Sequence, residues 1–287
     1  MTQAPVAVVT GASRGAGRGI AIALGSHGGT VYVTGRSEKA GDGGALSGTI
    51  HETAAAVTAA GGTGVAVRVD HAVDEQVKEL FEQVRREQGR LDILVNNACL
   101  IREALMSPVN FWEKPLEVAD MLDVGLRSSY VASHYAAPLL IAQQRGLVIF
   151  TSASGAVHYV FDPAYGAHKA GMDKLAADMA VDFRPFGVAS LSIWMGPLLT
   201  ERLELIIASD PQKYAALAAT AETPEFTGHI IWALYHDPEL MQLSGQTVIG
   251  AEMAVRYGIK DAGGRQPPSY RLTHGVAPRT QYPNIIR

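Results

Sequence analysis

The sequence predicts an α/β protein built as a single domain around a doubly wound, Rossmann-type parallel sheet of about seven strands. Short runs of β-branched and other apolar residues alternate with longer helical patterns, as they do in successive β–α–β units. The runs are apolar along nearly their whole length, which is typical of strands covered by helices on both faces. Doubly wound domains reach the chain's 287 residues without a second core.

Strands and helices are expected to alternate from residue 6 to residue 249. The expected strands are Val6–Val9, Thr30–Thr34, Gly64–Val69, Ile93–Val95, Leu147–Phe150, Val188–Ile193 and Thr247–Ile249. The expected helices are Gly17–His27, His51–Ala60, Asp74–Glu87, Leu116–Ala142, Ala164–Phe183 and Pro224–Tyr235.

Three stretches interrupt this alternation. Residues 37–48 are rich in glycine, Gly43 included, and are expected to form a flexible insertion after the second strand. Residues 198–222 contain an apolar helical pattern and are interpreted as a lid over the site. Residues 261–287 contain the pair Pro267-Pro268 and are expected to form an irregular C-terminal tail behind a domain of residues 1–260.

Composition and charge exclude several classes of protein. With 47% hydrophobic and 18% charged residues, the chain is not of the disordered type, and a formal net charge of −4 provides no basic surface for nucleic acid. No apolar run approaches the roughly 18 residues of a membrane span, and no basic segment precedes the first strand as in a signal peptide. Because Cys99 is the only cysteine, no intrachain disulfide is possible. These features predict a cytoplasmic protein.

A glycine-rich loop follows the first expected strand and leads directly into a helix. Its glycines permit a tight turn and a close backbone approach to a pyrophosphate, and the helix N-terminus supplies free N–H groups and a positive dipole end. A glycine cluster can also be a plain strand–helix turn, so the assignment depends on the further motifs described below. The cofactor contacts expected from this loop are Gly11, Ser13, Arg14, Gly15, Ala16 and Gly17.

The end of the second strand discriminates between the two nicotinamide cofactors. NAD enzymes usually carry an acidic residue there to hold the ribose 2′-hydroxyl, but this strand ends in Thr34-Gly35-Arg36 and the first acid is Glu38. Arg36 and Arg14 could clamp a 2′-phosphate between their guanidinium groups, or either could be a solvated surface residue. The pattern favours NADP(H) over NAD(H).

A second group of residues suits proton and hydride transfer. Tyr165 and Lys169 are four residues apart on one face at the start of a helix, and Ser152 closes the fifth strand at the crevice where ligands bind. A phenol of pKa about 10 is a poor proton shuttle at neutral pH, so a nearby ammonium and a cationic nicotinamide would have to favour the phenolate. Lowering the pKa of Tyr165 by ~3 units corresponds to about 4 kcal/mol. Lys169 would also hold the nicotinamide ribose, and Ser152 the carbonyl oxygen.

Together, the glycine loop and the Ser152, Tyr165 and Lys169 pattern resemble the short-chain dehydrogenase/reductase superfamily over about residues 5–255. The resemblance implies the segment Asn96-Asn97-Ala98 beside the adenosine ribose and helices that pack across a two-fold axis in a homodimer or homotetramer. It implies cofactor contacts by Tyr165 and Lys169 themselves and adds Asp70, Asn96, Ala98, Leu198 and Thr200.

Within the superfamily, residues 124–127, 173–178 and 255–258 are similar to the dehydrogenase/reductase family member 1 group. That group implies NADPH-dependent reduction of lipophilic carbonyl compounds. A lipophilic preference also fits the apolar segment from Leu198 to Ile207, which would exclude water from the nicotinamide.

The chain departs from the family pattern at three places. Cys99 replaces the glycine that usually follows Asn-Asn-Ala, and is either a packing residue or a reactive thiol. Met195-Gly196-Pro197 replaces the usual Pro-Gly, which would reshape the loop over the nicotinamide. Gly125 stands at the helix position where most members carry a catalytic Asn, so the water that relays protons to Lys169 is in doubt. We expect such a water to sit against the exposed carbonyl of Gly125, and Gly125→Asn to be tolerated.

Several other polar residues are given no catalytic role. No metal site is expected, because the histidines and the single cysteine lack the spacing of metal ligands. His158 and Tyr159 either line the substrate pocket or form an exposed loop. Asp173, Lys174 and Asp178 are assigned to a solvated or interface face of their helix.

The sequence therefore predicts an NADP(H)-dependent oxidoreductase that reduces lipophilic ketones or aldehydes, or oxidises the matching secondary alcohols. One alternative is an NAD-dependent hydroxyacyl or hydroxysteroid dehydrogenase. The other is a nucleotide-binding regulatory protein that has lost turnover, for which Gly125 is the only support.

Overall fold

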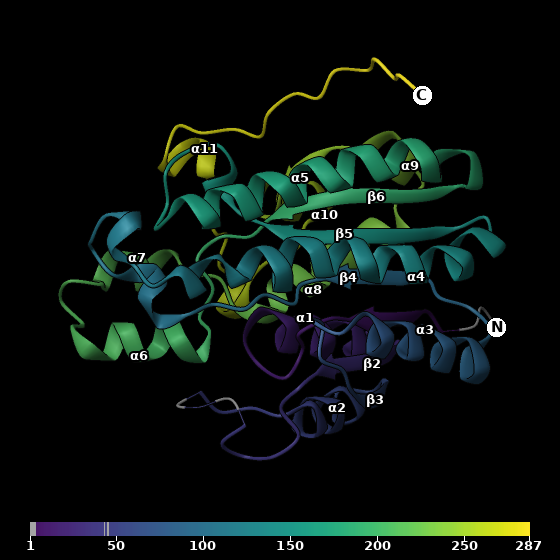
Figure 1. Cartoon of the computed structure of the whole chain (residues 1–287), viewed down its shortest axis with the longest axis horizontal. Helices are drawn as coiled ribbons and strands as arrows, with labels where there is room; N and C mark the ends of the chain where they lie inside the picture. The colour runs from purple at the N-terminus through teal and green to yellow at the C-terminus, as the bar shows by residue number, and fades with distance from the viewer. Residues whose placement is uncertain (1–3, 43, 45) are drawn as a thin grey trace.

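A computed structural model describes residues 4–42, 44 and 46–287; Gly43, part of the expected flexible insertion, lies outside the described residues. Its centre is a seven-stranded sheet in the order β3-β2-β1-β4-β5-β6-β7, in which every neighbouring pair is parallel (Figure 1). The strands are β1 (Val6–Val9), β2 (Thr30–Gly35), β3 (Thr63–Arg68), β4 (Ile93–Asn96), β5 (Gly146–Ser152), β6 (Val188–Trp194) and β7 (Thr247–Ile249). The predicted doubly wound α/β fold is confirmed.

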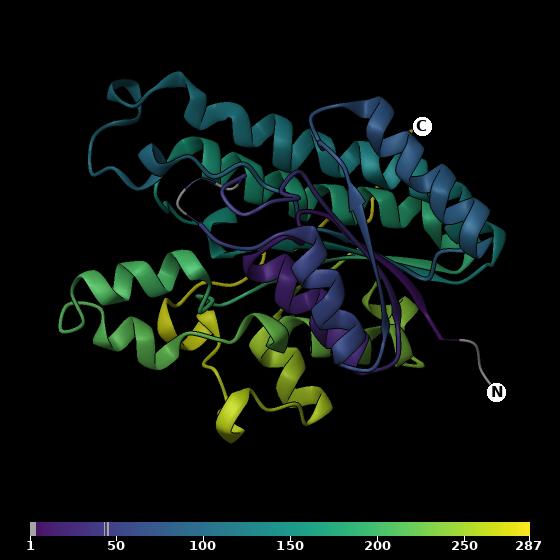
Figure 2. The ribbon, with the colours of Figure 1, turned by 90° about the horizontal axis from the view of Figure 1, so that it is seen from below.

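Helices cover both faces of this sheet because its strands are apolar on both sides. One core contains α1 (Gly15–Ser26), α2 (Ile50–Ala59) and α8 (Pro224–His236), and the other contains α3 (Asp74–Gln88), α4 (Ser128–Ala142) and α5 (Pro163–Phe183) (Figure 2). Val8 and Val9 illustrate the alternation, since these adjacent buried residues belong to opposite cores. The strand order reverses between β1 and β4, which opens a ligand crevice at the carboxyl ends of these strands.

The expected single helix over Leu116–Ala142 is wrong. The segment consists of a 3-10 turn η3 (Leu116–Leu122), a π turn η4 (Asp123–Arg127) and then α4. Val124 (φ −97°, ψ 85°) and Gly125 (φ 160°, ψ −77°) are not helical. Two hydroxyls hold this kink: Ser128 Oγ accepts from Gly125 N at 3.0 Å, and Ser129 Oγ donates to Gly125 O at 2.5 Å. Serine hydroxyls can replace the main-chain hydrogen bonds of a helix in this way, and the hydrophobic periodicity of the sequence does not reveal it.

Two further segments flank the carboxyl end of the sheet. Helices α6 (Glu201–Ser209) and α7 (Ala215–Thr220) project from one end of the molecule, the end that also carries η1 (Glu103–Met106) and η2 (Phe111–Glu113) (Figures 1 and 2). Beyond α9 (Leu240–Leu243) and α10 (Gly250–Tyr257), the chain continues through η7 (Ala262–Gly264) into α11 (Tyr270–Thr273). Tyr270 attaches α11 to the body, because its hydroxyl donates to Met195 O at 3.0 Å.

Among the residues that the structure describes, no helix combines the length and the apolar composition needed to cross a membrane.

Candidate active site

The glycine loop between β1 and α1 lies against the backbone that follows β4. Gly11 (φ +64°) and Gly15 (φ +56°) occupy the left-handed region that favours glycine. A Cβ atom on Gly11 would lie 2.6 Å from Ala98 Cα, so any larger residue would push the two segments apart. The expected contacts Gly11 and Ala98 therefore form one surface of the crevice.

Thr10 and Asn97 join the two segments by hydrogen bonds. Thr10 Oγ1 accepts from Asn97 N (2.8 Å) and Ala98 N (2.9 Å), and Asn97 Nδ2 donates to Thr10 O (2.9 Å) and Gly11 O (3.1 Å). Gly17 leaves room for this amide, because a Cβ there would lie 2.5 Å from Asn97 Nδ2. The main-chain carbonyls of Thr10 and Gly11 are thus occupied by the Asn97 amide.

Asn97, which the sequence reasoning left out of its site list, contacts the loop instead of Asn96. Asn96 is fully buried and its Nδ2 donates to Ser133 Oγ (2.9 Å) on α4. Successive side chains along a strand point to opposite faces. Applied to the end of β4, this alternation would have separated the two asparagines.

The start of the lid lies directly over the loop. Thr200 caps α6 through its hydroxyl, which accepts from Leu203 N, and its Cγ2 would lie 3.5 Å from a Cβ on Gly15. Glu201 follows, and its Oε2 accepts from Gly15 N at 2.9 Å. A carboxylate therefore occupies the position at the N-terminus of α1 where an anion is favoured. Thr200 was expected here; Glu201 was missed, although it is an acid next to that threonine.

Leu198 and Glu222 join the two ends of the lid segment. Leu198 forms a parallel bridge with Glu222, and its carbonyl accepts from Thr200 N at 2.7 Å. Glu222 is buried, which raises its pKa to about 7, and its Oε2 accepts from Gly196 N at 3.1 Å. The unusual loop Met195-Gly196-Pro197 is therefore held from within by a buried acid, which no sequence pattern had indicated.

Both predicted arginines lie at the carboxyl end of β2. Arg14 Nη2 donates to Ser37 Oγ and to Gly48 O, both at 2.9 Å. Arg36 is half-exposed, and its Nη1 lies 3.6 Å from Asp70 Oδ2. The structure thus gathers two cationic groups and the Ser37 hydroxyl near the expected adenine contact Asp70. Of the two remaining loop residues, Ser13 is buried and Ala16 is partly exposed in the first turn of α1.

At the chemical end, β5 and α5 bring Ser152, Tyr165 and Lys169 together. Lys169 Nζ donates to Thr151 O at 3.3 Å and lies 5.6 Å from the centre of the Tyr165 ring. Ser152 is fully buried, and its Oγ donates to Lys169 O at 3.1 Å. The triad predicted from the sequence is one spatial cluster at the carboxyl edge of the sheet.

Burial dominates the electrostatics of this cluster. It raises the pKa of the Tyr165 phenol, and the charges of Tyr270 and Cys99 act in the same direction. It lowers the pKa of the Lys169 ammonium. Desolvation therefore opposes the charged forms of both residues, and the lowering of the Tyr165 pKa predicted from the sequence would require the ammonium and a bound nicotinamide together.

Asp173 does not belong to a solvated face, so that assignment is wrong. It is buried one turn beyond Lys169; its Oδ1 accepts from Ser192 Oγ (2.6 Å) and its Oδ2 from Trp194 Nε1 (2.9 Å). Burial raises its pKa, against hydrogen bonds that include one from Ser152. Of the three residues in that assignment, Lys174 and Asp178 are exposed and form an ion pair with each other. The spacing of four from Lys169 places Asp173 on the same helix face and could have signalled its burial.

Two of the family departures meet at His168. A Cβ on Gly125 would lie 2.9 Å from His168 Nε2, and Cys99 Sγ lies 3.9 Å from His168 Nδ1. A side chain at position 125 would require the imidazole to shift, so the contact weighs against the expectation that Gly125→Asn is tolerated. Burial raises the pKa of the Cys99 thiol, which favours packing over reactivity.

The loop after β5, at His158, lies beside the C-terminal segment and is called here the wall of the site. His158 Nε2 lies 2.9 Å from Ser154 Oγ, and its ring centre is 5.8 Å from that of His274. Tyr159 is 71% exposed, so of the pair His158-Tyr159 only the histidine belongs to this wall.

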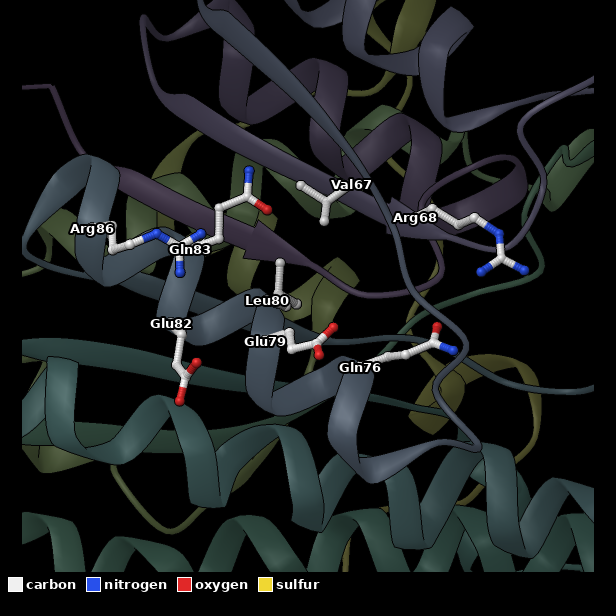
Figure 3. Close-up of a pocket in the computed structure, with 8 residues that line it drawn as sticks. All are labelled: Val67, Arg68, Gln76, Glu79, Leu80, Glu82, Gln83 and Arg86. Atoms are coloured by element: carbon white, nitrogen blue, oxygen red, sulfur yellow. The ribbon is translucent and has the colours of Figure 1, made fainter.

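A separate hollow of about 300 Å³ lies between β3 and α3, remote from this cluster (Figure 3). Its lining mixes acids and bases, among them Arg68, Glu79, Glu82 and Arg86, and contains none of the residues described above.

In the described part of the chain, no group of three or more His, Cys, Asp or Glu residues could hold a metal ion.

Comparison with known proteins supports the sequence resemblance. The family model for short chain dehydrogenases matches residues 5–209. Dehydrogenase/reductase SDR family member 1 from Mus musculus is 41% identical over 276 residues, which cover 92% of this chain and 85% of that protein. A 3-oxoacyl-(acyl-carrier-protein) reductase from Synechocystis sp. is 29% identical over 248 residues, covering 85% and 94%. The similarity to the member 1 group predicted from the sequence is confirmed.

The fold is also similar to solved structures. The crystal structure of a Xanthomonas campestris protein assigned as a dehydrogenase matches with a TM-score of 0.77 and 28% identity, over 93% of this chain and 96% of that one.

Asp173→Ala should lower the free energy of unfolding by about 3 kcal/mol, because the buried donors Ser192 Oγ and Trp194 Nε1 lose their acceptor. Asp178→Ala, on the exposed face of the same helix, should change it by less than about 0.5 kcal/mol. Urea unfolding of both variants measures the difference. Equal changes in the free energy of unfolding for the two variants would mean that Asp173 is solvated, as the sequence had suggested.

Proposed function

The chain belongs to the short-chain dehydrogenases, oxidoreductases that use a nicotinamide nucleotide, and from this premise we propose that it is an NADP(H)-dependent carbonyl reductase. Run in reverse, the same enzyme oxidises the matching secondary alcohols. The observation that carries the proposal is the cluster of Ser152, Tyr165 and Lys169 at the edge of the sheet that also holds the glycine loop.

The residues of the crevice fit such a cofactor. The glycine loop offers main-chain N–H groups to a pyrophosphate, and the carboxylate of Glu201 at Gly15 N already marks this point as an anion position. When bound, NADPH supplies the hydride. In our proposal Tyr165 donates a proton to the carbonyl oxygen, Lys169 holds the ribose hydroxyls and favours the phenolate, and Ser152 hydrogen-bonds the substrate oxygen.

Ser152 serves this role only after its hydroxyl turns. Its single proton is directed to Lys169 O, with Asp173 as a second acceptor, so the outward lone pairs can accept but not donate. A substrate oxygen with developing negative charge is a stronger acceptor than a peptide carbonyl. We therefore infer that the hydroxyl rotates as the charge develops.

The preference for NADP(H) rests on the charges at the end of β2. Arg14, Arg36 and the Ser37 hydroxyl provide donors suited to a 2′-phosphate, and the acid that pairs with Arg36 among the described residues is the partly exposed Asp70. An acidic residue in the position that would hold a ribose 2′-hydroxyl is missing from Thr34-Gly35-Arg36.

Lipophilic ketones and aldehydes are the proposed substrates. At the end of the molecule that carries both α6 and η2, the apolar side chains of Leu205, Phe111, Trp112 and Leu116 are 55–89% exposed. Arg202 Nη2 reaches Ile101 O at 3.5 Å and connects α6 with the segment that leads to them. Closing these apolar surfaces over a substrate would remove water from both.

We further propose a cytoplasmic homodimer or homotetramer that packs through α4 and α5. These helices carry apolar side chains at the margin of the core, such as Tyr135, Ile141, Leu175 and Met179, which are only partly buried in a single chain. Sedimentation velocity measures the assembly state.

The central test is NADPH consumption with a panel of aliphatic, aromatic, steroid and quinone carbonyls. We expect turnover that is greatest with apolar ketones, and a loss of at least ~10²-fold in Tyr165→Phe, because a general acid is removed. Tyr159→Phe, an exposed tyrosine in the neighbouring loop, is the matched control and should retain full activity. Tight NADPH binding without turnover on any carbonyl would instead identify a regulatory nucleotide-binding protein.

Arg36→Gln should weaken NADPH binding by about tenfold or more and leave NADH binding nearly unchanged, since a charged hydrogen bond to phosphate contributes about 1.5–3 kcal/mol. Arg68→Gln is the control: this arginine is equally exposed on the adjacent strand but pairs with Glu38. Calorimetric titration with both nucleotides measures the effect. Parallel losses for NADPH and NADH would disprove a 2′-phosphate contact.

Glu201→Gln should tighten NADPH binding several-fold. The carboxylate competes with the pyrophosphate for Gly15 N and repels it, and a charge at a helix N-terminus is worth about 0.3–1 kcal/mol. Glu204→Gln removes the same charge from the exposed face of α6 and should leave the dissociation constant unchanged. Weaker binding by Glu201→Gln would mean that the carboxylate supports the bound cofactor.

A further inference from the structure

His168 fills the space that Gly125 leaves open. The imidazole is 1% exposed. Its Nε2 would lie only 2.9 Å from a Cβ atom on Gly125 at the kink of η4, so a side chain there would be too close to the ring. The kink exists because the Ser128 and Ser129 hydroxyls satisfy the main-chain N–H and C=O groups of Gly125. A backbone bend and a missing side chain thus create a niche for one ring.

The ring is a neutral polar group with a free hydrogen-bonding atom. Its Nε2 is buried and has no hydrogen-bond partner among the described residues, while its Nδ1 faces Cys99 Sγ at 3.9 Å. Burial, reinforced by the charge of Lys169, holds the pKa of His168 well below 6.5. Buried polar atoms are rarely left unpaired, so an unpaired nitrogen in a polar niche indicates a bound water.

The niche adjoins a buried polar path that starts at Lys169. Lys169 Nζ donates to Thr151 O, Thr151 Oγ1 donates to Asn96 O (3.3 Å), and Asn96 Nδ2 donates to Ser133 Oγ. Ser133 Oγ donates to Ser129 O at 2.8 Å, which returns the path to the kink at Gly125. Asn96 Oδ1 is also buried without a partner in the described part of the chain. The path and the niche thus each contain one buried atom without a hydrogen-bond partner among the described residues, which a bound water would satisfy.

We propose that His168 is a positioning residue of the active site, whose Nε2 holds a water that exchanges protons with Lys169. The inference rests on the proposed function. Each carbonyl reduction consumes one proton: Tyr165 gives its phenolic proton to the substrate oxygen, and the ammonium of Lys169 restores that proton. A proton from bulk solvent then passes through the water held by His168 to the amine, so the water is left unchanged. His168 itself remains neutral throughout, because it accepts one hydrogen bond and takes up no proton.

The test compares three variants after the wild type has been shown to reduce a carbonyl compound. His168→Leu removes the nitrogen and should lower kcat by about tenfold, less than the loss of the proton donor itself, with KM and the NADPH dissociation constant unchanged. The solvent deuterium isotope effect on kcat should rise, because proton resupply becomes slower. His134→Leu, an exposed histidine on α4, is the control and should alter none of these quantities.

A paired substitution separates positioning from packing. Gly125→Asn alone should lower kcat because its side chain meets the imidazole, and His168→Ala alone because the water loses its anchor. The double variant places an amide in the vacated niche and should recover at least half of the wild-type kcat. If His168 only packs, kcat should fall in proportion to the loss in the free energy of unfolding across the three variants. The solvent isotope effect of the double variant would then not return to the wild-type value, which would contradict the proposal.

A spectroscopic readout makes the result independent of turnover. In ¹⁵N-histidine NMR spectra, the Nε2 resonance of His168 should have the shift of a hydrogen-bonded neutral imidazole and change in Gly125→Ala. An Nε2 resonance without a hydrogen bond, or an unchanged kcat and isotope effect in His168→Leu, would overturn the proposal while leaving the carbonyl reductase function intact. Inactivity of the wild type with a hydrogen-bonded Nε2 would instead overturn the proposed function and the relay together.

Discussion

The contact between the glycine loop and the segment after β4 determines the rest of the site. Gly11 and Ala98 approach so closely that neither backbone can move alone, and Thr10 and Asn97 lock them with four hydrogen bonds. This contact spans the point where the strand order reverses, so it sets the width of the crevice. The N-terminus of α1 and the start of the lid are both placed relative to it.

Desolvation is the common influence at the chemical end. Tyr165, Lys169, His168 and Asp173 are all shifted towards their neutral forms, because each lies where water is excluded. The same exclusion strengthens any charge interaction that a bound cofactor or substrate introduces. The side chains of such a site are mostly neutral without a ligand, and the charges of bound ligands favour their ionised forms.

The parts that the sequence predicts correctly are those set by local rules. Buried parallel strands read as continuous apolar runs, and Gly11, Gly15 and Gly17 signal their turn because no other residue tolerates it. The misses arise from tertiary contacts. The helix expected across Gly125 is interrupted where the Ser128 and Ser129 hydroxyls bond to its main chain. Nothing in the sequence distinguishes these two serines from serines inside a regular helix. Asp173 resembles its exposed neighbours in sequence and differs only in the Ser192 and Trp194 donors that β6 brings to it.

The departures from the family pattern make physical sense as a set. Gly125 alone would look like the loss of a functional side chain, and Cys99 alone like a surplus thiol. Around His168 they become complementary: one provides the space, and the other provides a small, uncharged neighbour whose pKa burial keeps high. A larger residue at position 125 would have to displace the imidazole from this niche, so the two positions are coupled. The absence of a side chain at position 125 is therefore better explained by what occupies its place than by a decline of the site.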